Sequence, residues 1–80
     1  MTKKKIELKD IKAGTKYAAH HPELKENFVI IGVNAAGQFC TEGWPPTVGL
    51  FAHLENLVEG DALTAEEMGY RKMMFGENWL

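Results

Sequence analysis

The amino-acid sequence predicts an α+β domain in which a small antiparallel sheet of three or four strands, over about residues 5–42, is covered on one face by two carboxyl-terminal helices, at about 48–58 and 65–75. A hairpin pattern, an apolar stripe with helical spacing and a helix-capping pattern predict this fold. A chain of 80 residues supports one small core, so residues 1–80 are predicted to form a single domain. Residues 1–4 are predicted to be a frayed basic arm.

The first strands are predicted from alternation. Residues 5–9 alternate polar and apolar side chains, as a half-buried strand does. Ala13-Gly14 then predicts a turn into a short second strand at 15–18. His20-His21-Pro22-Glu23 is predicted to interrupt this segment, and Pro22 favours an extended conformation at His21.

The hairpin pattern is the clearest signal. Residues 28–33 and 38–41 are rich in β-branched and aromatic side chains, and the turn between them begins with Asn34 and ends with Gly37. A link of this length and composition is typical of a β-hairpin. The first arm is apolar on both faces, which predicts a central strand that is covered on both sides.

A first helix is predicted at 48–58, with Thr47 as its N-cap and Gly60 as its stop. A strand over 50–54 is the alternative, and it fits fewer positions. The apolar stripe that favours the helix consists of Leu50, Phe51, Leu54, Leu57 and Val58.

A second helix is predicted over 65–75. Thr64 and Glu67 stand at the spacing of a capping box, in which each side chain bonds the other residue's backbone N–H. Leu63 and Met68 have the spacing of the hydrophobic staple that accompanies such a cap.

Composition excludes several classes of protein. An apolar content of 45% with 25% charged residues excludes a disordered or fibrous chain. The single cysteine, Cys40, cannot form an internal disulfide, and no apolar stretch is long enough to span a bilayer. A cytoplasmic protein without a membrane association is therefore predicted.

Charge is distributed unevenly along the chain. Residues 1–16 contain six lysines, whereas residues 42–67 contain six acidic residues and no Lys or Arg. An acidic surface repels phosphate backbones and suits a basic partner, although it can also serve only to keep a small protein soluble.

Four residues could ligate a metal: His20, His21, Cys40 and His53. None has the paired spacing that places two ligands on one element, so the sequence predicts no metal site. Residues 32–37 have the glycine frame of a phosphate-binding loop but lack the Lys and the Ser or Thr that hold phosphate and magnesium. No cofactor is predicted.

The sequence gives little support for a catalytic pair, either a cysteine with a histidine or two carboxylates. Cys40 could pair with His53 or His21 in space, but no cationic neighbour or helix N-terminus that would activate the thiol is evident. Glu66 and Glu67 are explained by the capping box and the helix dipole. The chain is therefore predicted not to be an enzyme.

The predicted function is that of a non-enzymatic protein-binding module, a small accessory or regulatory factor, such as a phage or mobile-element inhibitor, that occupies the surface of a partner protein with a basic surface. The stiff Gly-Trp-Pro-Pro segment could hold Trp44 outward, or fold it back as a lid over the sheet. A homodimer formed through the apolar carboxyl-terminal residues is a related prediction, in which the partner is a second copy of the chain. The predicted partner-binding residues are Glu42, Trp44, Pro45, Pro46, Phe51, Trp79 and Leu80.

A small nucleic-acid-associated β-domain is the alternative function. It would use the basic amino-terminal segment, in which Lys3, Lys4 and Lys5 are consecutive. The lysines lack the interleaved aromatic residues of single-strand binders, and the rest of the chain is anionic, so nucleic-acid contact is disfavoured.

Overall fold

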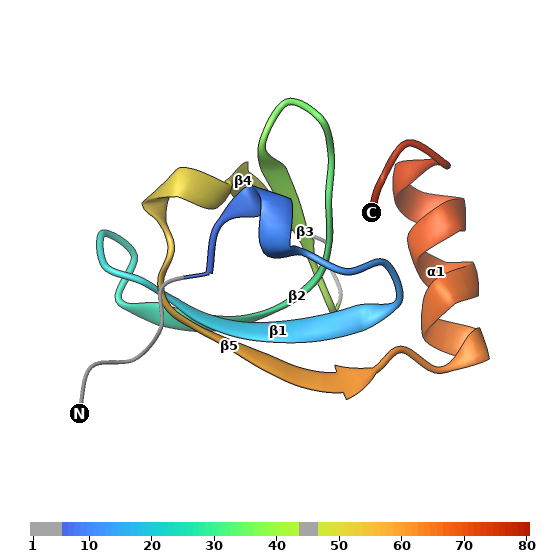
Figure 1. Ribbon diagram of the computed structural model, residues 1–80, viewed down its shortest axis with the longest axis horizontal. Helices are drawn as coiled ribbons and strands as arrows, with labels where there is room; N and C mark the ends of the chain where they lie inside the picture. The colour runs from blue at the N-terminus through green and yellow to red at the C-terminus, as the bar shows by residue number, and fades with distance from the viewer. Residues whose placement is uncertain (1–5, 44–46) are drawn as a thin grey trace.

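The computed structural model describes residues 6–43 and 47–80 of the chain. Its strands are β1 (Thr15–His21), β2 (Glu26–Val33), β3 (Gln38–Thr41), β4 (Val48–Leu50) and β5 (Glu55–Ala62). A short 3-10 helix, η1 (Leu8–Asp10), precedes β1, and a second one, η2 (Phe51–His53), joins β4 to β5. The α-helix α1 (Ala65–Phe75) follows β5 and stands beside the end of the sheet (Figure 1).

The strands form one antiparallel sheet in the order β4-β3-β2-β1-β5. The first four strands form a meander, and β5 returns across the domain to pair with β1. The α+β class is confirmed. The prediction of three or four strands ending near residue 42 is wrong, because the described residues contain five strands, two of which come after that point.

The predicted helix at 48–58 is also wrong, since this segment forms β4, η2 and the first half of β5. Its apolar side chains recur every three residues for two local reasons. The 3-10 turn of η2 spaces Phe51 and Leu54 by three, as such turns do. Asn56 then adopts a left-handed conformation with a φ of 57°, which interrupts the strand alternation, and both Leu54 and Leu57 are buried.

A strand at 5–9 is not formed either, because residues 8–10 form η1. The backbone N–H of Glu7 donates to the carboxylate of Asp10 at 3.2 Å and so closes this turn. Leu8 and Ile11 are spaced by three, and both pack against the core from the turn. Lys5 lies outside the described residues.

The hairpin is confirmed as β2 and β3, with Val33 opposite Phe39. Asn34 closes the turn, because its side-chain oxygen accepts hydrogen bonds from the backbone N–H groups of Ala36 and Gln38, each at 3.0 Å. The turn also needs a positive φ, of 80°, at Gly37. The second predicted strand, at 15–18, is confirmed as the first part of β1.

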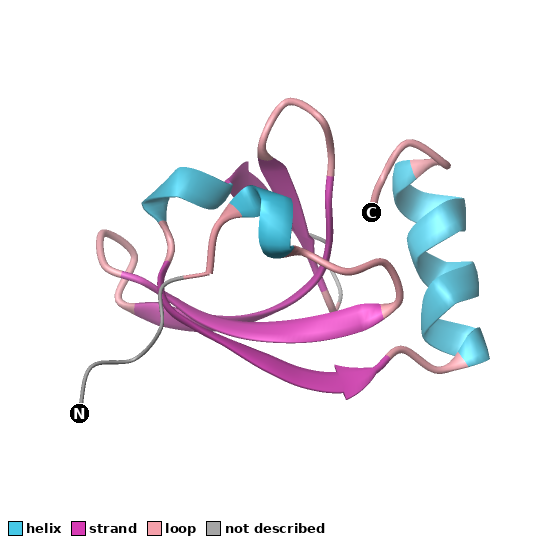
Figure 2. Cartoon of the chain, viewed as in Figure 1, coloured by secondary structure: helices cyan, strands magenta, loops and turns pink. Residues whose placement is uncertain are grey.

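The main core lies on one face of this sheet and is closed by η1 and η2, which lie on the same side of β1 in Figure 2. Ile31 and Cys40 are buried outside this cluster, and Arg71 and Leu80 approach β2 there at Gly32. The central strand β2 is therefore covered on both faces, as predicted. The 3-10 helices close the core on one face, and α1 with the residues after it covers the other, where two helices were predicted. The core cluster consists of Tyr17, Ala19, Ile30, Val33, Phe39, Phe51, Leu54 and Leu57.

The predicted helix at 65–75 is confirmed with its capping box. The Thr64 hydroxyl accepts from the Glu67 N–H, and the Glu67 carboxylate accepts from the Thr64 N–H, both at 3.1 Å. Lys16 of β1 contacts the same carboxylate at 2.7 Å, which links the start of the helix to the sheet and lowers the pKa of Glu67.

Thr64→Ala should lower the free energy of unfolding by about 1 kcal/mol, because it leaves an N–H of the first helical turn without its acceptor. Urea denaturation measures this loss, and Thr64→Ser, which keeps the hydroxyl, is the control. A loss below about 0.2 kcal/mol would show that the cap does not stabilise the helix.

Candidate functional site

The structure separates the predicted partner-binding residues into different regions. Residues 44–46 lie outside the described residues. Glu42 follows β3, where its exposed carboxylate stands 3.8 Å from the Lys16 ammonium group. Phe51 is buried in η2 and lines a groove that is described below.

Trp79 and Leu80 lie beside the turn between β2 and β3, on the side of this turn that faces α1 (Figure 1). The Trp79 ring packs against Phe75 with 5.4 Å between the ring centroids. Its backbone pairs with Asn34, and the Leu80 N–H donates to the oxygen of Val33 at 2.9 Å. The tail is therefore folded back onto the end of β2. A role of these two residues in partner binding stays a prediction.

An open groove of about 870 Å³ runs along η2, and we call it the η2 groove. Its floor is apolar, because Phe51, Leu54 and Leu57 belong to the core cluster. Leu50, at the end of β4, stands in its wall and is 48% exposed. The lining residues are Ile6, Glu7, Leu8, Pro22, Glu23, Ala36, Gly37, Leu50, Phe51, Ala52, His53, Leu54, Glu55, Asn56 and Leu57.

The charged residues of the groove are acidic. Glu7, Glu23 and Glu55 line it from three separate segments of the chain, and none of the described lining residues is a lysine or an arginine. Lys9 stands 3.5 Å from the Glu7 carboxylate, but both side chains are largely exposed, so water and salt weaken this pair. The η2 groove therefore combines an apolar floor with an anionic rim.

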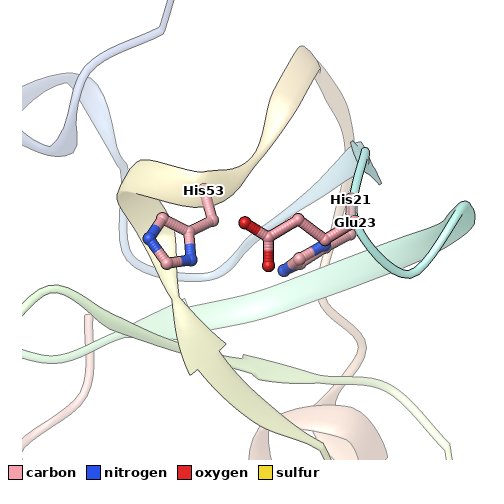
Figure 3. A group of neighbouring side chains, drawn as sticks. All are labelled: His21, Glu23 and His53. Atoms are coloured by element: carbon pink, nitrogen blue, oxygen red, sulfur yellow. The ribbon is translucent and has the colours of Figure 1, made fainter.

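A cluster of His21, Glu23 and His53 lies at the edge of the groove (Figure 3). His21 ends β1, Glu23 follows it in the turn to β2, and His53 ends η2. One ligand atom from each side chain lies within 4.8 Å of those from the other two. The two imidazole rings meet edge to face, with 6.1 Å between their centroids.

The hydrogen bond that His21 accepts defines which of its ring nitrogens carries the proton in the neutral form. Its ring is buried, and its Nδ1 atom accepts a long hydrogen bond, of 3.3 Å, from the backbone N–H of Leu24. An accepting Nδ1 carries no proton, so neutral His21 carries its proton on Nε2. Glu23 and His53 are both exposed.

The spacing of metal ligands in the sequence could not reveal this cluster, because its two histidines come from elements that meet only in the folded chain. Of the other predicted candidates, His20 is bound to the side chain of Asn27 at 3.0 Å. Cys40 is fully buried beside Arg71, near Gly32. Neither residue belongs to the cluster.

Burial raises the pKa of the Cys40 thiol to about 11, against an opposing effect of Arg71. At pH 8 native Cys40 should therefore react with iodoacetamide about a hundredfold more slowly than the protein unfolded in urea. The raised pKa contributes stability below the ordinary value of 9.0, and this contribution is lost as the pH rises through about 11. Equal labelling rates for native and unfolded protein would show that the thiol is accessible and that its pKa is not raised.

Comparison of the chain with protein-family models, with curated proteins and with solved structures finds no match. Within residues 6–43 and 47–80, no helix is long and apolar enough to cross a membrane. A function must therefore be inferred from the groove and the cluster.

Proposed function

We propose that this chain is a non-enzymatic protein-binding module, and that its η2 groove takes a short segment of another protein in which apolar side chains are flanked by Lys or Arg. The module would act as a regulatory factor by occupying that segment. The observation that carries the proposal is the apolar floor of the groove within a rim of carboxylates.

The apolar part of the groove supports contact with a side chain of the partner. Leu50 is 48% exposed although it adjoins Phe51 of the core, so its side chain can still be buried by a ligand. Concave apolar surfaces beside polar residues are typical of peptide-binding sites, where a few buried anchors supply most of the binding energy.

The charged part of the groove supports the choice of a basic partner. Glu7, Glu23 and Glu55 add their potentials over the same opening, and they would attract cations and repel acidic segments. A nucleic acid, which presents phosphates, would meet the same repulsion. The nucleic-acid alternative depends on residues 3–5, which lie outside the described residues, and it stays a prediction.

Selection from a library of short random peptides tests the proposal. We expect enrichment of peptides with two or more apolar residues next to Lys or Arg, and loss of their binding to the Leu50→Asp variant. Val48→Asp is the matched control, because Val48 lies on the same strand, is 49% exposed and does not line the groove. No enrichment, or an acidic consensus, would contradict the proposal. Self-association that is lost in Leu50→Asp would instead identify a second copy of the chain as the occupant.

The salt dependence of the same binding is a separate expected result. Because rim charges mainly accelerate encounter, raising the ionic strength should slow association and leave dissociation nearly unchanged. Surface plasmon resonance at two salt concentrations measures both rates. An association rate that does not change with salt would show that the carboxylate rim does not attract the partner, and would contradict this part of the proposal.

A further inference from the structure

We propose that His21, Glu23 and His53 form a binding site for one divalent transition-metal ion, with Zn²⁺ as the ion to test. The proposal stands independently of the peptide-binding function, since it uses ligand chemistry at the edge of the η2 groove rather than its apolar floor. It rests on the three converging side chains in Figure 3, whose ligand atoms lie within 4.8 Å of one another.

The ligand types favour this class of ion. Two imidazoles and one carboxylate are a ligand set that Zn²⁺ and neighbouring transition metals accept, whereas Mg²⁺ and Ca²⁺ prefer oxygen ligands throughout. Three protein ligands leave a fourth position, which water fills in many zinc sites. The carboxylates of Glu7 and Glu55, which line the same groove, raise the local concentration of cations.

The geometry requires only a small closure. Ligand atoms around a tetrahedral zinc ion stand about 3.3 Å apart, so the present separation of up to 4.8 Å must shrink. His21 is buried and serves as the fixed ligand. Glu23 and His53 are exposed, and no hydrogen bond to another described residue holds either side chain. Their side chains can therefore rotate toward the ion.

Metal binding at His21 displaces the Leu24 N–H whichever ring nitrogen ligates. Nδ1 can bind the ion directly in place of this N–H, whereas ligation through Nε2 requires the Nε2 proton to leave and Nδ1 to take up a proton. The number of protons on the ring is unchanged, but Nδ1 can no longer accept from the Leu24 N–H. That hydrogen bond is long, at 3.3 Å, and the exposed turn allows water to replace it.

The first experiment is calorimetric titration of Zn²⁺ into the full-length, tag-free protein, with Mg²⁺ as the negative control. We expect one Zn²⁺ per chain, and affinity about tenfold or more weaker in His53→Ala and Glu23→Gln. His20→Ala is the matched control, because this neighbouring histidine is bound to Asn27, and its affinity should stay within about twofold of the wild type. Circular dichroism confirms that each variant is folded.

The second measurement is the backbone amide signal of Leu24 in a nitrogen–proton NMR spectrum. Zn²⁺ should shift this signal strongly in the wild type and only weakly in His53→Ala, because binding releases the Leu24 N–H from His21. Absence of stoichiometric Zn²⁺, or unchanged affinity in folded His53→Ala, would overturn the proposal. So would an equal loss in His20→Ala, which would show adventitious binding to surface histidines.

Discussion

Phe39→Ala should lower the free energy of unfolding by about 3–5 kcal/mol, the usual cost of deleting a buried aromatic ring. Phe39 is only 1% exposed, and its ring lies 6.1 Å from that of Phe28, between centroids. It also covers Gly49 of β4, where an added Cβ would come within 2.6 Å of the ring. The ring therefore fills the space between β3, β4 and the core.

Urea denaturation of the wild type and the variant measures this effect. A domain of this size has a total stability of about 5–10 kcal/mol, so the variant should keep about 0–7 kcal/mol and unfold at a clearly lower urea concentration. Phe75→Ala is the control, because it removes the same ring from a half-buried place on α1. A loss for Phe39→Ala no greater than that for Phe75→Ala would show that the described core is misplaced.

Arg71→Ala should lower the free energy of unfolding by about 2–4 kcal/mol, because it removes two charge-assisted hydrogen bonds and a buried aliphatic stem. Arg71 is 4% exposed, and its guanidinium group donates to the main-chain oxygens of Trp79 and Leu80. Its side chain also approaches Gly32 of β2. The tail should therefore detach from the sheet when this side chain is lost.

Two comparisons separate the causes of that loss. Arg71→Met keeps an apolar stem without the donors, so it should lose less stability while the tail still detaches, which hydrogen exchange at the Leu80 N–H reports. Lys72→Ala changes an exposed neighbour and should alter stability by no more than about 0.5 kcal/mol. If Arg71→Met keeps the Leu80 N–H protected, the guanidinium group does not hold the tail.

The elements that the sequence predicted correctly are specified by local interactions. The helix at 65–75 begins with a capping box that spans three residues, and the hairpin is closed by Asn34 and Gly37 within a single turn. The wrong element predictions at 5–9 and 48–58, the second of which also made the strand count wrong, concern 3-10 turns and a left-handed Asn56. At 48–58 these features space the apolar residues by three, which resembles the spacing of a helix. At 5–9 the alternation that predicted a strand ends at Leu8, where the 3-10 turn begins.

The candidate site was predictable only in part. Phe51 was among the predicted partner-binding residues, and it lines the η2 groove. The acidic rim and the pairing of His21 with His53 could not be predicted, because they depend on β5 returning to pair with β1. That return places η2 beside the turn after β1, and no short-range pattern in the sequence records it.

The affinity of Leu50→Asp for the most strongly enriched basic–apolar peptide tests the binding proposal most directly, measured beside Val48→Asp and Trp44→Ala. We expect Leu50→Asp to bind about tenfold or more weakly than the wild type, and Val48→Asp to stay within about twofold. Unchanged affinity in a folded Leu50→Asp variant, together with a large loss in Trp44→Ala, would contradict the proposal and move the binding site from the η2 groove to residues 44–46.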